Sequence, residues 1–207
     1  MEKMNQFKEL LGLHAAVDVA FRNLKEQYPD EVCCRPGCVD CCHACFDISF
    51  VEAALISFGF QRMNDMEKRQ EVLQRAKTAG LEIEEQLSNL PEKRENREVL
   101  EQFSLWRIRC PLLGDDQQCS LYDYRPVTCR VYGLPTAIGG QGHVCGFSGF
   151  DQGKTYPTIK MDDIAGHLLG MSQKLAEGFS DPIRQWGRKR MFVYEALTLN
   201  LVDPEKT

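Results

Sequence analysis

The sequence lacks the features that mark three common classes of protein. It has no basic excess, since 25 lysines and arginines stand against 30 aspartates and glutamates, so we expect no nucleic-acid partner. It has no N-terminal basic segment followed by an apolar run and a cleavage site, and we expect a cytoplasmic protein. Its longest stretch without a charged residue, 131–150, holds six glycines and a proline. This stretch predicts a loop and no membrane association.

The chain also lacks internal repeats and low-complexity segments. With 207 residues and 43% hydrophobic content, it is long enough to bury a core without cross-links. We expect a single domain over residues 1–207, with a cysteine-rich core at about 31–150 flanked by N- and C-terminal helices.

Helical periodicity is clear before the first cysteines. Seven residues at alternating spacings of three and four predict a helix with one buried face, ended by Pro29. These residues are Phe7, Leu10, His14, Val17, Phe21, Leu24 and Tyr28. Because His14 lies on the apolar face, we interpret it as a hydrogen-bonded core histidine.

Further helices are predicted in the middle of the chain. Ser49 and Glu52 form a capping-box pattern ahead of the apolar run 53–60, which indicates a helix start. Residues 64–90 carry an apolar stripe opposite many charges and predict a surface helix or helix pair. Residues 92–106 predict another short amphipathic helix.

The last third of the chain also favours helices. Residues 162–175 predict one helix, and Asp181-Pro182 predicts the start of another that continues through Leu201. Only residues 119–122 indicate a short strand. The expected fold class is therefore mainly α, with a helical scaffold around irregular cysteine-rich metal-binding loops and little sheet.

Cysteine is the one residue type present in unusual number, with ten in the chain. In a reducing compartment, dense cysteine usage indicates metal ligation more often than disulfides. Six cysteines fall within 33–45. Of these, Cys38 and Cys41 have the two-residue separation that lets two thiolates reach one metal. Cys129 follows Pro126 at a predicted helix start, where backbone N–H groups favour a thiolate.

In combination these motifs resemble those of the YkgJ-like family, the zinc- or iron-chelating CxxCxxCC proteins. The matching segments are Cys34-x3-Cys38-x2-Cys41-Cys42, Cys110-Pro111-x-Leu113, Cys119-Ser120-Leu121-Tyr122 and Arg125-Pro126-x-x-Cys129-Arg130. The resemblance implies that seven cysteines ligate metal, namely Cys34, Cys38, Cys41, Cys42, Cys110, Cys119 and Cys129.

One further cysteine is a candidate ligand from its own surroundings. Cys145 lies among glycines, which let a backbone approach a site closely. Cys33 and Cys45 fall outside the pattern and are interpreted as bystanders, because cysteine is often buried as a small apolar group. His43 and His143 are either substitutes for a thiolate or solvent-facing residues.

The ligand count leaves the stoichiometry open. Eight cysteines suffice for two four-thiolate sites, whereas one [4Fe–4S] cluster or one zinc needs only four. Thiolates suit both zinc and iron–sulfur clusters. Clustered spacing with a distant contributor favours a [4Fe–4S] cluster, and zinc stays the alternative.

The leading functional prediction is a metal-binding protein with a redox or structural role, in which a protein partner is an open expectation. A second hypothesis is a cluster-dependent protein lysine methylase, because the signature also resembles that of flagellin lysine methylases. A third is a thiol oxidoreductase that uses Cys38 and Cys41. No catalytic residue can be assigned. The segment Gly139-Gly140-x-Gly142 lacks the spacing and the preceding strand of a nucleotide-binding loop.

Overall fold

The computed structural model describes residues 2–90, 105–151, 153–199 and 201. It confirms the expected fold class, because 53% of the described residues are helical and 9% are strand. The described residues form seven α-helices, three short 3-10 helices and two small sheets. The helix predicted at 92–106 falls mainly within 91–104, outside the described residues.

The chain divides into two compact units, each built from two separate stretches of sequence. The first unit comprises Met1–Cys38 and Arg125–Lys189, and the second comprises Val39–Tyr124 and Arg190–Thr207. The single domain expected from the sequence stays a prediction.

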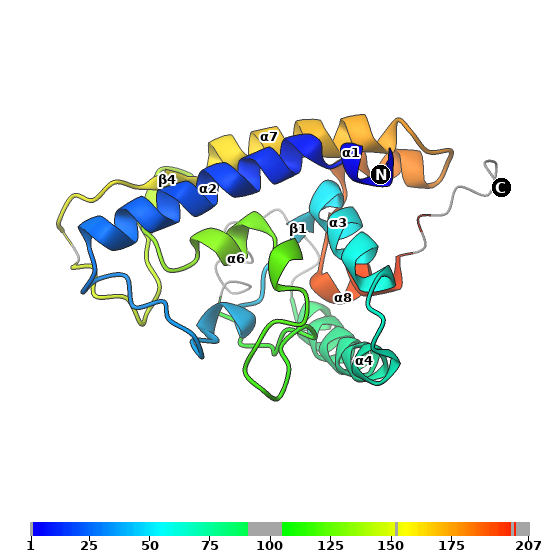
Figure 1. Ribbon diagram of the computed structural model, residues 1–207, viewed down its shortest axis with the longest axis horizontal. Coiled ribbons are helices and arrows are strands. Elements are labelled where there is room, and N and C mark those ends of the chain that lie inside the picture. The colour runs from blue at the N-terminus through cyan, green and yellow to red at the C-terminus, as the bar shows by residue number, and fades with distance from the viewer. Residues whose placement is uncertain (1, 91–104, 152, 200, 202–207) are drawn as a thin grey trace. The chain divides into compact units, whose positions relative to one another are not determined.

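Two long helices frame the first unit. Helix α2 (Lys8–Gln27) follows the short α1 (Glu2–Asn5) and lies beside α7 (Met161–Ala176), as Figure 1 shows. Helix α6 (Val127–Val131) packs on α2, and a 3-10 helix, η3 (Ile183–Arg188), packs on α7. The predicted helix at 162–175 is thus confirmed within one residue at each end.

The predicted apolar stripe of the first helix is confirmed in α2. Leu10, His14, Val17 and Leu24 are buried along it. His14 is 3% exposed, and neither ring nitrogen has a hydrogen-bond partner among the described residues. The histidine is therefore a core residue as expected, but the expected hydrogen bond is missing. Burial, assisted by the nearby Arg130, lowers the pKa of His14 to about 4.

The sheet of the first unit accounts for the glycine-rich segment. Strands β2 (Thr136–Ile138) and β3 (Gln141–His143) form an antiparallel hairpin, and β4 (Ile159–Lys160) pairs in parallel with β2. Gly139 and Gly140 make the two-residue turn, with φ of 56° and 76°, a conformation that suits glycine. The glycines serve a hairpin turn. A strand does precede them, contrary to the sequence prediction.

The second unit is organised around a buried helix. The capping box is confirmed, because the Ser49 N–H donates to Glu52 Oε2 over 2.9 Å and α3 (Phe50–Gln61) begins there. Every residue of α3 up to Phe60 is buried, as expected for a helix that is apolar on all sides. Helix α8 (Val193–Thr198) packs on α3.

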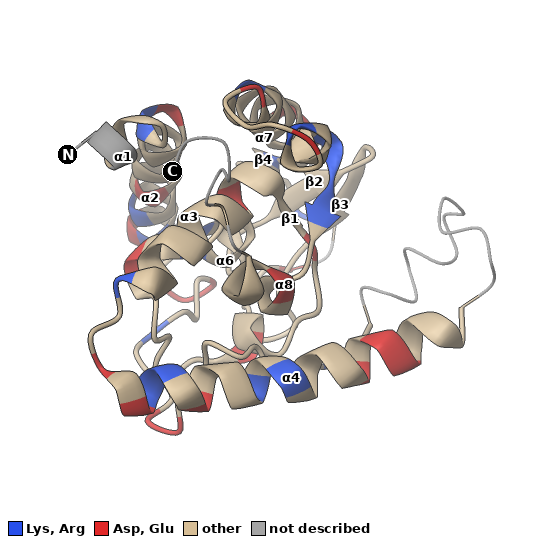
Figure 2. Cartoon of the chain, turned by 90° about the vertical axis from the view of Figure 1, so that its right-hand side faces the viewer, with Lys and Arg blue, Asp and Glu red and all other residues tan. Residues whose placement is uncertain are grey.

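Helix α4 (Met66–Ser88) covers α8 and is one continuous helix. Of the two predicted alternatives, a single helix or a helix pair, the single helix is therefore correct. Its buried face includes Val72, Ala76 and Ile83. Charges of both signs lie along the rest of its length, as Figure 2 shows.

The helix predicted from Pro182 onwards is confirmed only in part, because it is not continuous. The segment is instead the 3-10 helix η3, the strand β5 (Arg190–Met191) and α8. Strand β5 pairs with β1 (Ile48–Ser49), matching Met191 with Ile48. Pairing of these strands needs extended backbone, and it therefore overrides the helical pattern of the sequence.

No helix within the described ranges is both long and apolar enough to cross a bilayer.

The buried imidazole predicts a specific dependence of stability on pH. Because the pKa of His14 is about 4 in the folded chain and about 6.5 when unfolded, the unfolded state binds this proton first as the pH falls. Stability is retained above pH 6.5 and lost between about pH 6.5 and 4, by up to about 3 kcal/mol. His14→Leu should remove this component, which urea unfolding of both proteins at several pH values measures. Parallel profiles for the two proteins would contradict it.

Candidate metal centre

The eight predicted ligands divide equally between the two units. Cys34, Cys38, Cys129 and Cys145 belong to the first, and Cys41, Cys42, Cys110 and Cys119 belong to the second. No disulfide joins any of the ten cysteines in the structure. The division passes through the first motif, between Cys38 and Val39.

In the second unit, two cysteine segments run antiparallel to each other. A 3-10 turn, η1 (Asp40–Cys42), carries Cys41 and Cys42. The segment 106–110 pairs with the residues around this turn through a β-bridge between Ala44 and Arg107. The Cys110 N–H donates to the Cys42 carbonyl over 2.7 Å. The Cys41–Cys42 turn and Cys110 are therefore held next to each other by backbone contacts.

A tight loop returns the chain from Cys110 to Cys119. The Ser120 N–H donates to the Leu112 carbonyl over 2.8 Å, and Leu113 and Cys119 form a β-bridge. This bridge is the only strand-like feature that the structure describes at 119–122. The short strand predicted there is wrong, because Tyr122 begins a 3-10 helix, η2 (Tyr122–Tyr124).

The sulfur of Cys110 has a strongly perturbed pKa. Part of the residue reaches solvent, but its sulfur is desolvated, and this burial raises the pKa of the thiol to about 12. The sulfurs of Cys119 and Cys41 are near enough to raise the pKa further, whereas backbone N–H groups of Leu112 and Leu113 hydrogen-bond to the sulfur and lower it. A thiolate here would accept hydrogen bonds from these backbone N–H groups, but its burial deprives it of solvation.

Two buried donors beside these cysteines have no acceptor among the described residues. They are Nη2 of Arg75 and the hydroxyl of Ser120. Arg75 donates from Nε to the Pro111 carbonyl over 3.0 Å, which places its guanidinium at the Cys110 turn. Unsatisfied buried donors are rare. Next to thiolates they suit an anionic group such as a metal ion surrounded by sulfur.

In the first unit, the Cys34 side chain lies against Gly133. Any residue with a Cβ at that position would displace the cysteine sulfur. A Cβ at Gly133 would lie 2.1 Å from the Cys34 sulfur and 3.8 Å from the Phe21 ring. Lys25 donates to the Cys34 carbonyl over 2.7 Å. Cys34 is thereby fixed between α2 and the turn after α6.

Cys145 lies in a turn that directs a backbone donor at its sulfur. The Phe147 N–H donates to the Cys145 sulfur over 3.4 Å, and the Ser148 N–H donates to the Cys145 carbonyl over 2.9 Å. A donor two residues after the cysteine also occurs at Cys110. Such donors favour the deprotonated sulfur, which supports the sequence argument for Cys145 as a ligand.

Cys129 is the third residue of α6, which begins after Pro126 as the sequence predicts. Its neighbour Arg130 has a buried side chain that pairs with Asp18 over 2.7 Å and donates to the Arg125 carbonyl. These contacts give Arg130 a structural role within the first unit.

The cysteines outside the motif have structural surroundings. Cys45 is 8% exposed and packs with Ala79, Ile83 and Ile108, and this burial raises the pKa of its thiol to about 12. Cys33 points its sulfur at the Asp30 carbonyl over 3.6 Å. Of the two histidines, His43 contacts the Val39 carbonyl through Nδ1 over 3.1 Å, and His143 is exposed.

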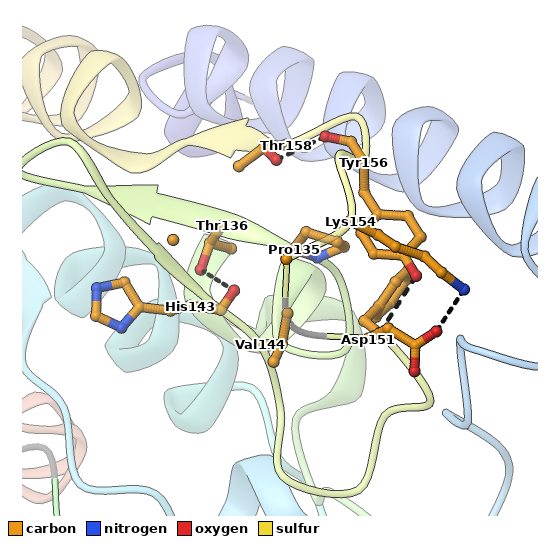
Figure 3. Close-up of a pocket in the computed structure, with 11 residues that line it drawn as sticks. Pro135, Thr136, His143, Val144, Asp151, Lys154, Tyr156 and Thr158 are labelled. Carbon is orange, nitrogen blue, oxygen red and sulfur yellow. Dashed lines mark hydrogen bonds and ion pairs between the residues drawn. The ribbon is translucent and has the colours of Figure 1, made fainter.

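The first unit also has a surface hollow beside the Cys145 turn. Figure 3 shows this pocket of about 310 Å³, which includes His143 and Val144 just before Cys145. Asp151 and Lys154 at its rim are exposed and form an ion pair with each other. Because these charges are already paired and open to solvent, we assign the pocket no ligand.

Within the described residues, no three histidine, cysteine, aspartate or glutamate side chains already surround one common metal position. The surroundings nevertheless fit a thiolate-bound metal, because donors point at the sulfurs of Cys110 and Cys145. The ligand set of eight cysteines stays a prediction.

A mainly helical scaffold that carries paired cysteine turns defines a cysteine-rich metal-chelating class of protein. Residues 33–146 match the model of the CxxCxxCC family, described as "Putative zinc- or iron-chelating domain". Since the match covers more than half of the chain, the protein belongs to this family, and the resemblance seen in the sequence is confirmed. Comparisons with curated proteins and with solved structures returned no match.

The contact between Gly133 and Cys34 can be tested with a double-mutant cycle. Gly133→Ala should force the Cys34 side chain to rotate and destabilise the metal-free protein by about 1 kcal/mol. In a Cys34→Ala background the same substitution should be nearly neutral. Urea unfolding of the four proteins measures the coupling.

Gly170→Ala in α7 is the matched control, because nothing lies within 4 Å of a Cβ added there. It should be neutral or stabilising, since alanine is the better helix former. Equal losses for Gly133→Ala in both backgrounds would remove Cys34 as the cause.

Proposed function

We propose that this protein holds an iron–sulfur cluster through its cysteine thiolates. The observation that carries the proposal is the Cys110 sulfur, which is desolvated yet receives backbone N–H donors and lies near Cys41 and Cys119. A buried thiolate needs a cation to offset its charge. A metal bound at this sulfur meets that requirement.

The donor set supports a cluster over a zinc ion. Cys41 and Cys42 are adjacent in one turn, Cys110 and Cys119 come from a loop about 70 residues later, and the spacing is not that of two clean pairs. The unsatisfied donors on Arg75 and Ser120 suit the additional acceptors that inorganic sulfide provides. Zinc bound to the same thiolates is the alternative outcome of the experiment below.

A bound cluster would supply electron transfer or a fixed cross-link between the loops. The chain's own residues position the thiolates, direct N–H groups at the sulfurs and exclude water from Cys110. Structural metal sites contribute on the order of 10 kcal/mol to folding. A structural role is therefore energetically sufficient by itself.

A cytoplasmic location and a protein partner are part of the proposal. A reducing compartment keeps thiols available to a metal. The net charge of -5 favours a protein over nucleic acid as partner.

The two enzyme hypotheses predict different measurements. A cluster-dependent methylase should bind S-adenosylmethionine, which calorimetry on the metal-loaded protein detects. A thiol oxidoreductase using Cys38 and Cys41 needs both thiols titratable, whereas a metal-bound protein has few titratable thiols.

The deciding experiment is anaerobic purification followed by iron, sulfide and zinc analysis and a visible absorption spectrum. We expect about four iron and four sulfide per cluster with broad absorbance. Zinc without colour would replace the cluster with a zinc site. A protein without bound metal would overturn the proposed function.

A matched pair of cysteine variants tests the ligand assignment. Cys110→Ser should lose most of the bound metal, because serine rarely replaces a thiolate ligand. Cys45→Ser should keep it, although burial raises the pKa of both thiols to about 12. Metal analysis of both purified variants provides the comparison. Full metal content in Cys110→Ser would remove Cys110 from the ligand list.

A further inference from the structure

We propose that Asp40 and Arg107 form a positioning pair, which sets the Cys41–Cys42 turn against Cys110 and thereby determines metal affinity without ligating the metal. This inference rests on the proposed function, because it concerns the affinity of the same thiolate site. It assigns a role to a residue within the first cysteine motif, at the position just before Cys41.

Asp40 begins the turn that presents two cysteines. Its carbonyl accepts N–H groups from His43 over 3.0 Å and Ala44 over 3.2 Å, which closes the turn around Cys41 and Cys42. Its side chain is 8% exposed. A buried carboxylate at this place needs a compensating partner.

Arg107 provides that partner from the facing segment. Its guanidinium forms an ion pair with the Asp40 carboxylate and also lies 3.5 Å from the Asp40 carbonyl. Arg107 is at the same time the residue bridged to Ala44. One side chain therefore contacts both the charge and the backbone of the turn, from three residues before Cys110.

The register of these segments decides where the Cys110 sulfur points. Successive side chains on an extended segment face opposite sides, so a slip of one residue would turn Cys110 away. Few backbone contacts hold the register: the Ala44–Arg107 bridge, the Cys110-to-Cys42 bond and a Cys45-to-Trp106 bond of 3.3 Å. A charge-assisted contact adds direction to this short pairing.

The pair also matters for the charge of the site. Metal ligation requires thiolates at Cys41 and Cys42, directly after the Asp40 carboxylate. An uncompensated carboxylate there would repel them. The positive charge of Arg107 largely offsets this repulsion. Loss of Arg107 alone should therefore weaken metal binding more than loss of both Asp40 and Arg107.

The same unit contains a matched control pair. Asp47, directly before β1, and Arg190 in β5 form an ion pair of 2.7 Å, and their side chains are 41% and 47% exposed. Like Asp40 and Arg107, they join two segments that run antiparallel. Neither the Ala44–Arg107 bridge nor the Cys110-to-Cys42 bond involves them.

The test is an anaerobic Co²⁺ titration of the full-length, reduced, metal-free protein, followed through thiolate-to-cobalt absorption. Asp40→Asn and Arg107→Gln should each weaken Co²⁺ binding about 10-fold or more. Arg107→Lys, which keeps the charge, should lose less. The double variant Asp40→Asn/Arg107→Gln should bind no worse than Arg107→Gln alone, because the two residues act as one pair. Asp47→Asn should bind as the wild type does.

Thermal unfolding separates positioning from simple stabilisation. A positioning pair reduces the Co²⁺-dependent rise in melting temperature, whereas a stabilising pair lowers the melting temperature equally with and without metal. Wild-type affinity in Asp40→Asn or Arg107→Gln, or independent additive losses in the double variant, would overturn the inference while leaving the metal centre intact. Failure of the wild type to bind Co²⁺, together with absence of bound metal after anaerobic purification, would instead refute the proposed function.

Discussion

The desolvated sulfur of Cys110 is the constraint on which the candidate site of the second unit depends. A thiol in this position could be accommodated as a small apolar group, as Cys45 is in its cluster with Ala79, Ile83 and Ile108. Cys110 differs because backbone donors from Leu112 and Leu113 point at its sulfur and two further cysteine sulfurs lie close by. Burial disfavours the charged thiolate, whereas the hydrogen bonds favour it, and a bound cation would satisfy both. The loop return at Cys119, the Arg75 contact to Pro111 and the pairing with the Cys41–Cys42 turn all serve to keep that atom in place.

The sequence was most informative where local physics is sufficient. The stripe from Leu10 to Leu24, the capping box at Ser49 and the helix at 162–175 depend on periodicity and on nearby hydrogen bonds, and each was predicted correctly. The chain after Pro182 was not, because β5 depends on a strand more than 140 residues earlier. Likewise, Cys119 pairs with Leu113 through a loop whose turn includes a left-handed Gln117. No sequence pattern identified that residue as a turn position.

The sequence predicted the candidate site only as a set of cysteines, which stays a prediction, and it did not predict the surroundings of their sulfurs. Cysteine spacing and the family motifs predict which sulfur atoms ligate metal, and the family match confirms the class of protein. The groups around the sulfurs were missed, because Asp40, Arg75 and Ser120 are ordinary residues whose importance comes from burial and contact. Gly133 was missed for the same reason, since only a structure reveals that a Cβ there would meet the Cys34 sulfur. The Asp of the motif was the one available signal, as a carboxylate among prospective thiolates is electrostatically unfavourable unless it has a partner.

The discontinuous composition of the first unit has a consequence for synthesis. Helix α2 buries Leu10, Val17 and Leu24, and it packs on α6 and α7, which lie more than 100 residues later in the chain. During synthesis, the apolar face of α2 therefore has no α6 or α7 to pack on until residues 39–124 of the second unit have been made. At ordinary elongation rates this interval lasts several seconds or more. During that time Cys34 and Cys38 have been made, but Cys129 and Cys145 of the same unit have not. The nascent chain therefore exposes both the apolar face of α2 and unligated thiols to chaperones and metal donors.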